Sequence, residues 1–512
     1  MKNRLCYIIY LIFLSFIANA QREADSFING DCFQIEGLGC NTPNANQIIK
    51  FNEDSLEQII EPLNLNLATY FSRAAFCDKN TGNLIFASNG WRLVNREGDI
   101  LAEKLWRDDI PWPGDNPDTT MILNTLGPLF LNDPGDSTKA YLLYGQYKAV
   151  EYGSEITKAD VLFTYAYLDI PSKSMISKNN IILTDTTTSG DMTACRHANG
   201  RDWWVIKAGV YEDEYYTGLL GPNGLNMSKM TVPEIIHRGQ YSTSSFFSHD
   251  GLKFLHYTGK GFKYLHEYDF DRCTGTLSNP IVHDLSDSLY FDALYACTIS
   301  PDGSKFYITK GGSPHVPGTL QYDLITQTYT YISNFAGGLL LAPNGKTILA
   351  TSFFIENNQF YRFYSEINYP NAYGTASNYV PFKYPIDNND TFVFTQNYAN
   401  FRLGAETGSI CDSLSIGFPT LEKGNVVLDA QVYPNPFTNE FTIQLKTPPS
   451  SALQLQVYDG IGRLVHQSSI VNKTTTINTQ ELAQSTGLFY ITLTDVNGKV
   501  VFGKKMVKIN KE

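Results

Sequence analysis

Three cysteines stand at equivalent distances from glycine-containing turns and are the first candidates for chemistry. Cys77, Cys195 and Cys297 precede Gly82, Gly200 and Gly303 by five, five and six residues, respectively. A catalytic cysteine needs a neighbouring base or positive charge that lowers the pKa of its thiol. Equal positions on equivalent strands instead predict small buried core residues. We therefore expect no nucleophile among them, and the sequence assigns no catalytic residue.

His249 is a candidate general base because imidazole titrates near neutral pH. It occupies the place in its turn that Pro301 and Pro343 hold in two similar turns. We therefore predict that His249 is a turn residue.

Acidic residues gather in three loops rich in Pro and Gly, where oxygen ligands could bind calcium. None matches the twelve-residue calcium loop that ends in Glu, so solvated turns are the favoured interpretation and calcium is the one cofactor left open. The Cys and His spacings of zinc sites, the Gly-x-Ser-x-Gly motif and phosphate-binding glycine loops do not occur. The three loops contain Asp108-Asp109, Asp115 to Asp118, and Asp133 with Asp136.

A repeated pattern must position these residues: an apolar strand, a tight turn with Gly, and a second apolar or aromatic strand. Asp-Gly and Asn-Gly favour such turns because the central residues need positive φ. The turn glycines at 200, 251, 303 and 345 are 51, 52 and 42 residues apart, which is typical of a β-propeller built from four-stranded blades. The copies lie around Gly82, Gly200, Gly251, Gly303 and Gly345, with a further one at residues 133–144.

We expect residues 21–425 to form seven blades, with eight as the alternative. A degenerate copy near residues 392–401 supplies the last blade, which the N-terminal segment completes. The many Tyr and Phe residues suit sheets that pack face to face.

The first 20 residues predict a signal peptide. Lys2 and Arg4 precede an apolar stretch, and Ala18-Asn19-Ala20 supplies a cleavage site before Gln21. The stretch is too short to span a membrane, so we expect no transmembrane anchor in the mature chain. Export permits disulfides, and Cys32 and Cys40 are close enough to form one.

Charge divides the chain of 512 residues, whose formal net charge is −12. The signal peptide has two basic residues, and residues 431–512 have eight basic and five acidic ones, so residues 21–430 carry −17. An acidic body lacks the electrostatic attraction that nucleic-acid binding requires. Residues 426–430 are the predicted linker to the basic tail.

Most of residues 65–415 resembles secreted propeller proteins of Bacteroidetes. The resemblance implies a surface-exposed propeller used for binding, and it supplies no catalytic residues. It rests on residues 82–90, 94–99, 196–204, 268–271 and 274–275.

Residues 431–512 resemble the C-terminal sorting domain of the type IX secretion system, in its type A form. An immunoglobulin-like accessory module is the alternative, and it would also be a small β-sandwich. The resemblance implies handling by the type IX machinery, passage across the outer membrane and removal of the tail. It rests on Pro434, Asn435 and Pro436, then Gly462 and Arg463, Gly487 and Tyr490, and finally Lys504 and Lys505.

The sequence therefore predicts an exported, cell-surface or secreted propeller that binds an extracellular glycan, peptide or protein. The alternative is an exported hydrolase or lyase that degrades polysaccharide or peptide, with a site on the propeller loops. A pocket with two carboxylates, or with His beside a carboxylate, would favour the alternative.

Overall fold

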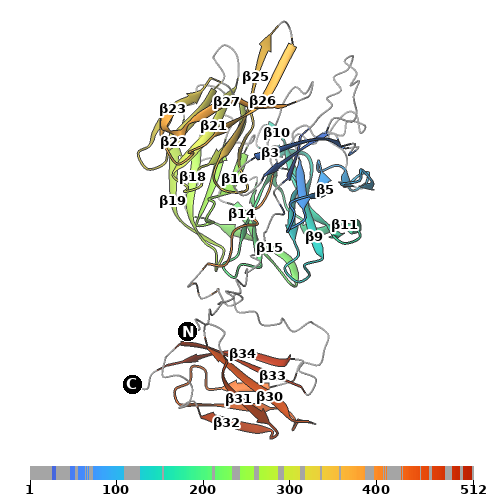
Figure 1. Cartoon of the computed structure of the whole chain (residues 1–512), viewed down its shortest axis with the longest axis vertical. Helices are drawn as coiled ribbons and strands as arrows, with labels where there is room; N and C mark the ends of the chain where they lie inside the picture. The colour runs from blue at the N-terminus through green and yellow to red at the C-terminus, as the bar shows by residue number, and fades with distance from the viewer. Residues whose placement is uncertain are drawn as a thin grey trace, which may run out of the picture. The chain divides into compact units, whose positions relative to one another are not determined.

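The chain folds as antiparallel β-strands in two compact units, residues 1–412 and 413–512 (Figure 1). The structure, a computed structural model, describes residues 26–29, 46–51, 56–63, 73–108, 127–232, 243–285, 293–386, 397–411 and 428–509, with short gaps, and a few single residues such as Glu23. In this part the only helix is the short 3₁₀ helix η1 (Gly374–Ser377). No described helix has the length and hydropathy of a membrane span. The all-β prediction is confirmed.

Most of the N-terminal unit consists of meanders, in which four consecutive strands pair in chain order. Four of these meanders form separate sheets, in which strands with buried residues are joined by turns. The first is β4 (Ala74–Cys77), β5 (Leu84–Ser88), β6 (Leu93–Asn95) and β7 (Ile100–Ala102). The others are β16 (Thr243–Phe247), β17 (Lys253–Thr258), β18 (Tyr264–Asp271) and β19 (Thr276–Asp284); β20 (Ala293–Ile299), β21 (Lys305–Gly311), β22 (Gly318–Asp323) and β23 (Thr328–Ser333); and β24 (Leu339–Leu341), β25 (Ile348–Glu356), β26 (Gln359–Ile367) and β27 (Tyr379–Ile386).

Two further meanders merge into one eight-stranded sheet through the pairing of β10 with β12. A buried ion pair reinforces this junction: Lys207 Nζ lies 2.7 Å from Asp160 Oδ2, and both side chains are 1% exposed. The first meander is β8 (Leu129–Asn132), β9 (Lys139–Tyr152), β10 (Glu155–Asp169) and β11 (Ser174–Leu183), and the second is β12 (Thr187–Arg196), β13 (Trp203–Gly209), β14 (Glu214–Gly221) and β15 (Gly224–Thr231).

The predicted repeat turns all join the first and second strands of a meander. The turn glycines have φ between 65° and 73°, a region that side chains with Cβ rarely adopt. Carboxylates, amides and serine hydroxyls bind the turn backbone; Asp302 Oδ1, for example, accepts from Ser304 N at 3.0 Å. The glycines are Gly82, Gly200, Gly251, Gly303 and Gly345.

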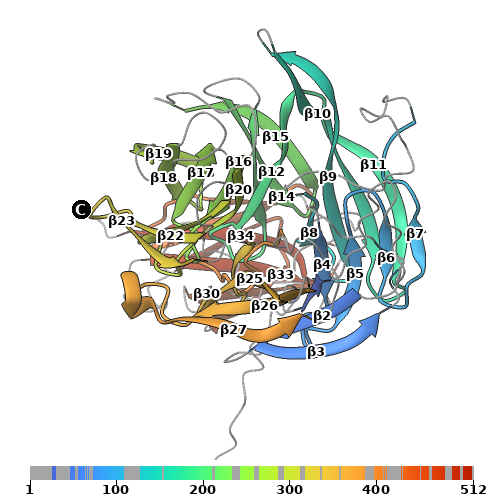
Figure 2. The same cartoon turned by 90° about the horizontal axis from the view of Figure 1, so that it is seen from above.

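The N-terminal strands form a sheet of their own: β1 (Ser26–Asn29), β2 (Asn46–Phe51) and β3 (Leu56–Leu63). Figure 2 shows the sheets around a common centre, with β2 and β3 between β26–β27 and β4–β5. Phe51 packs with Leu349 and Tyr364 of the last meander, and β1 lies beside β4.

This arrangement corrects the expected end of the body. The meander that starts at β24 already has four strands of its own, so it needs no strand from the N-terminal segment. Residues 397–401 form no strand, and residues 392–396 lie outside the described residues. The prediction of a strand fails at residues 397–401 because Tyr398 and Phe401 pack against the core from a loop; Phe401 contacts the rings of Phe76 and Trp203.

The C-terminal unit has two sheets that share one core. Phe441, Ile443 and Leu445 alternate along one strand and are fully buried, as expected for a half-buried strand. One sheet is β28 (Ala430–Tyr433), β29 (Glu440–Leu445) and β32 (Thr474–Asn478), and the other is β31 (Leu464–Ile470), β30 (Leu453–Asp459), β33 (Gly487–Thr494) and β34 (Val500–Lys508).

Candidate functional site

A cleft of about 650 Å³ opens at the end of the N-terminal unit where the repeat turns lie, which we call the turn end. Its size falls within the range of roughly 300–1,000 Å³ that ligand pockets occupy. Three repeat turns contribute, those that follow β4, β8 and β12, together with Glu23 and the β10–β11 turn. The polar side chains in the lining include Asp78, Lys79, Asn132, Asp133, Arg196 and Arg201.

Arg196 is the most deeply placed cation in this lining, and 3% of the residue is exposed. Its guanidinium lies 3.6 Å from the Trp203 ring centroid and donates to Arg201 O at 2.9 Å. Burial lowers the pKa of Arg196 to about 10, and the nearby Glu23 carboxylate opposes this shift. The side chain therefore keeps its positive charge at neutral pH.

The cleft carboxylates are held by their own turns. Burial alone would raise the pKa of Asp78, but hydrogen bonds from Thr81 and Asn80 outweigh burial and lower it. Asp133 accepts from Gly135 N at 2.7 Å and from Tyr167 Oη at 2.6 Å. These hydrogen bonds hold the two carboxylates in place, where they can also accept hydrogen bonds from a ligand.

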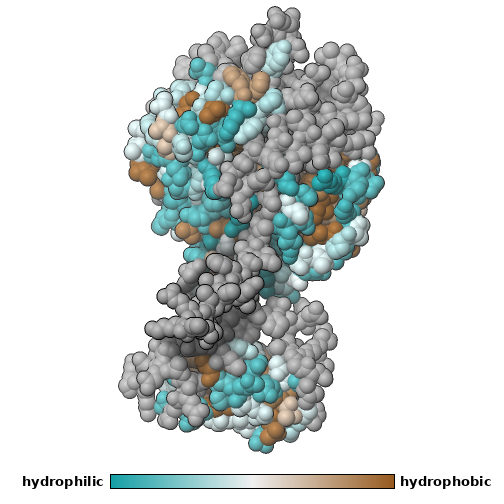
Figure 3. All heavy atoms as spheres, in the orientation of Figure 1, coloured by the Kyte–Doolittle hydropathy of each residue, from teal (hydrophilic) through white to brown (hydrophobic). Residues whose placement is uncertain are grey.

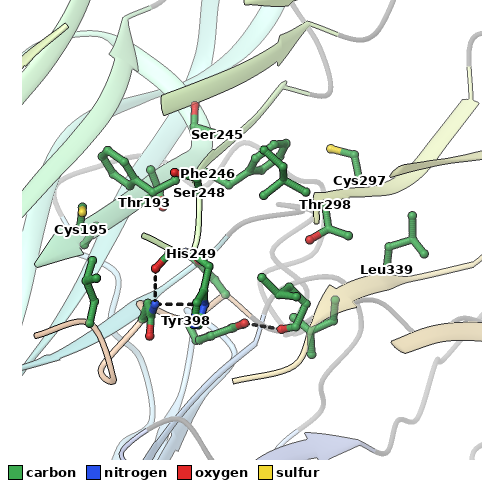
Figure 4. Close-up of a pocket in the computed structure, with 18 residues that line it drawn as sticks. Thr193, Cys195, Ser245, Phe246, Ser248, His249, Cys297, Thr298, Leu339 and Tyr398 are labelled. Atoms are coloured by element: carbon green, nitrogen blue, oxygen red, sulfur yellow. Dashed lines mark hydrogen bonds between the residues drawn. The ribbon is translucent and has the colours of Figure 1, made fainter. Parts of the chain in front are cut away.

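A second cavity, of about 110 Å³, lies among the first strands of four meanders (Figure 4). Strands β12, β16, β20 and β24 line it, together with part of residues 397–411, which we call the strap. Asn400 Nδ2 donates to His249 O at 2.8 Å, and burial lowers the pKa of His249. The Tyr398 hydroxyl donates to Leu341 O.

The candidate cysteines are not assembled into a catalytic pair. Cys195 and Cys297 lie at opposite ends of the cavity in Figure 4. Burial raises the pKa of Cys195 to about 12, which disfavours the reactive thiolate. Cys77 is buried and Cys297 is half-buried, and neither belongs to a disulfide. Their positions fit the predicted core role.

Sequence reasoning missed a pairing of Ser245 with His256. The two residues are opposite each other on β16 and β17, and Ser245 Oγ lies 3.2 Å from His256 Nδ1. A histidine beside a serine can activate the hydroxyl. Ser245 lines the 110 Å³ cavity, however, which is smaller than the roughly 300–1,000 Å³ of ligand pockets. The pairing depends on the register between β16 and β17, which could not be predicted from the sequence.

The strap crosses the turn end and ties distant meanders together. Asn397 Nδ2 donates to Met192 O at 3.1 Å, Arg272 donates to Gly404 O at 2.5 Å, and a disulfide joins Cys273 to Cys411. This disulfide was not predicted because 138 residues separate its cysteines. The expected pair of Cys32 and Cys40 lies outside the described residues.

The acidic loops lie only partly within the described residues. Asp108 pairs with Lys104 at 2.7 Å, and Asp136 Oδ1 accepts from Thr138 N at 2.9 Å. Residues 109–126 lie outside the description. In the described ranges, no three His, Cys, Asp or Glu side chains gather as metal ligands.

In the C-terminal unit, the two ends of the predicted sorting motif lie side by side. Val507 N donates to Asn435 Oδ1 at 2.8 Å, and Lys504 Nζ donates to Val432 O at 3.0 Å. Pro434 and Pro436 flank Asn435, and both follow cis peptide bonds. Gly487 begins β33, where Tyr490 is buried, and Lys505 is in β34. Gly462 and Arg463, like Ala18, Ala20 and Gln21, lie outside the described residues.

Solved structures with some likeness to the chain include enzymes and other proteins. TolB from Acinetobacter baumannii shares 13% identity at a TM-score of 0.30, over 55% of this chain and 57% of that one. A periplasmic gluconolactonase from Pseudomonas aeruginosa shares 13% at 0.38, over 68% of this chain and 95% of that one. A putative 6-phosphogluconolactonase from Bacteroides fragilis shares 13% at 0.36, over 64% and 92%. At these TM-scores, no activity carries over to this chain.

No curated protein matches the chain. Residues 431–510 match the family described as the secretion system C-terminal sorting domain. This match confirms the type IX interpretation of the tail, and such a domain marks a protein for export to the cell surface or the medium. The chain therefore carries a type IX C-terminal sorting domain at residues 431–510, attached to a larger all-β unit.

Proposed function

We propose that the chain is an exported binding protein whose N-terminal unit holds an extracellular glycan, peptide or protein at the turn-end cleft. The sorting domain implies handling by the type IX machinery. We further propose that residues 1–20 direct Sec export and are then removed by cleavage between Ala20 and Gln21, and that the Pro434–Pro436 segment and the basic end at Lys504 and Lys505 have a sorting function. The body then acts outside the cell.

We propose that the body is a seven-bladed β-propeller spanning residues 21–425, followed by a linker at 426–430. Within the described residues, six four-stranded meanders and the three-stranded N-terminal sheet support seven blades over eight. We propose an immunoglobulin-like sandwich for the tail, because its two sheets of short strands share a core.

The cleft of about 650 Å³ is the observation that carries the binding proposal. Side chains of both charges line it, and turn backbone, ring stacking or a neighbouring carbonyl holds Asp78, Asp133 and Arg196 in place. Such preorganisation reduces the entropy lost when a ligand binds. The groups favour a polar ligand that offers both hydrogen-bond donors and acceptors.

The proposal is tested by screening the full chain against glycan and peptide arrays with two cleft variants, Lys79→Glu and Arg201→Gln. Lys346→Glu is the matched control, since Lys346 follows the glycine of another repeat turn and does not line the cleft. We expect ligands whose retention falls with the cleft variants and not with the control. Turnover of a polysaccharide or peptide would establish the hydrolase or lyase alternative, and ligands indifferent to the cleft variants would place binding elsewhere.

A further inference from the structure

Four tyrosines and an isoleucine are exposed on the outer strand of the β20–β23 sheet and on the loop that contacts it. Tyr329 and Tyr331 lie on the edge strand β23 and are 45% and 47% exposed; Tyr369 and Tyr373 lie in the loop 368–378 and are 61% and 41% exposed. Ile325, 78% exposed, belongs to the turn before β23. We call these five residues the tyrosine rim. Single exposed apolar side chains are ordinary, but a group of them marks an interaction surface.

The rim spans both sides of β23. Tyr329 is opposite Tyr322 and Tyr331 is opposite Leu320, so these tyrosines share one face of the sheet. Thr330 is opposite Gln321 on the other face, where the loop 368–378 is attached. The six residues of β23 give the rim a length of about 20 Å. The exposed rings therefore lie on the two sides of an edge strand, which forms a ledge between them, and not in a pocket.

Buried hydrogen bonds hold this ledge rigid. Gln321 is fully buried; its amide donates to Ala372 O at 2.7 Å and accepts from Gly374 N at 2.7 Å. Tyr307 Oη donates to Pro370 O at 2.7 Å. The loop is thus anchored from beneath while Tyr369 and Tyr373 face solvent. Anchoring requires polar groups to be buried, but it holds the loop in one conformation. Little conformational entropy of the loop is then lost when a ligand binds the aromatic rings.

The rim residues and their neighbours in the sequence are uncharged although the body is strongly acidic. Residues 324–345 and 367–382 contain no Asp, Glu, Lys or Arg. Nucleic acid and anionic membranes both need cations on the protein, so neither fits. The four tyrosines of the rim carry hydroxyl groups as well as apolar surface. Thr326 and Thr328, which are exposed and near the tyrosines in the sequence, add further hydroxyl groups. Figure 3 shows apolar residues only as separate patches on a mainly hydrophilic surface.

From this chemistry we propose that the tyrosine rim binds an uncharged polysaccharide. Sugar rings present C–H faces that pack on aromatic rings, and hydroxyls that exchange hydrogen bonds with Tyr and Thr. A chain polymer also matches an extended ledge better than a compact ligand does. The rim does not overlap the lining of the turn-end cleft, so this proposal stands apart from the proposed function.

The test is affinity electrophoresis of the full chain in gels that contain xyloglucan, galactomannan or starch, with alginate as the anionic polymer. Two double variants remove the rings: Tyr329→Ala with Tyr331→Ala, and Tyr369→Ala with Tyr373→Ala. The matched control is Ile176→Ala with Ile181→Ala on the outer strand β11, where both side chains are about half exposed. All these side chains are exposed, and thermal unfolding checks that each variant is folded.

We expect at least one neutral polysaccharide to retard the chain, and each tyrosine double variant to weaken that binding about tenfold or more. The isoleucine variant should bind like the unaltered chain, as should the cleft variant Lys79→Glu. Retardation by none of the neutral polymers, or by alginate alone, would overturn the proposal. Self-association that the tyrosine variants abolish would overturn it too, because it would assign the rim to a second copy of the chain.

Discussion

Cys273, in the turn between β18 and β19, is disulfide-bonded to Cys411 at the end of the strap. The bond closes a segment of 138 residues, and Arg272 beside it holds the strap through Gly404 O. The strap is therefore part of the body, although it contains no strand.

Replacing Cys411 with Ser should destabilise the N-terminal unit by about 2–5 kcal/mol, because the unfolded chain regains the freedom that the cross-link removes. Chemical denaturation measures this change. Cys297→Ser is the control, since Cys297 does not belong to a disulfide. Equal stability of the Cys411→Ser variant and the unaltered chain would show that the strap is not held by the disulfide.

The buried pair of Lys207 and Asp160 gives a second prediction. Lys207→Met should cost about 3–5 kcal/mol, since it leaves a carboxylate buried without its cation. Adding Asp160→Asn should recover much of the loss. Lys229→Met, at the more exposed pair with Glu214, should cost at most about 1 kcal/mol. Similar losses for the two lysine variants would contradict the burial argument.

Alanine substitutions at two glycines distinguish the free-energy cost of a strained backbone from the cost of a steric clash. Gly224 has φ +91° and open space where Cβ would lie, whereas a Cβ on Gly345, at φ +65°, would come within 2.3 Å of the His249 ring. Gly224→Ala should therefore cost about 1–2 kcal/mol from the left-handed conformation alone. Gly345→Ala should cost more. Urea unfolding of the two variants decides, and equal costs would mean that the His249 ring moves aside freely.

Gly345 and the other repeat-turn glycines show which parts of the fold can be predicted from the sequence. Each repeat turn was predictable because positive φ and a polar side chain that binds the turn are local requirements. The N-terminal sheet, the strap and the disulfide were not, because they depend on contacts between residues that are far apart in the chain. The cleft was missed for the same reason: Asp78, Asp133 and Arg201 were visible only as turn residues until three turns were brought together.

Glu267 should make stability depend on pH. Its burial would raise the carboxyl pKa, but hydrogen bonds from His283, at 2.9 Å, and Lys253 outweigh burial and hold the pKa below 4.5. A folded-state pKa below the unfolded value contributes stability above about pH 4.5 that is lost as the pH falls through the folded pKa.

Glu267→Gln should therefore flatten the fall in unfolding free energy below pH 4.5, by up to about 1.4 kcal/mol per pH unit. Urea midpoints between pH 3 and pH 7 measure this slope. Glu103→Gln, at a side chain that is 65% exposed, serves as the control. An unchanged slope in Glu267→Gln would assign the acid sensitivity to other groups.

The sorting domain predicts where the body goes when the tail is changed. Deleting residues 431–512 should remove the protein from the cell surface and medium and leave it in the periplasm, because the sorting domain is lost while the proposed signal peptide remains. Fractionation with an antibody against the body measures this. Asn435→Ala is the sharper variant: it removes the acceptor that binds Val507 N, so it should weaken the link between the two ends of the sorting motif and reduce export partially. Thr438→Ala, three residues along, is the control for a small change in the same segment. Unchanged display of the deleted chain would show that the body reaches the surface without the sorting domain.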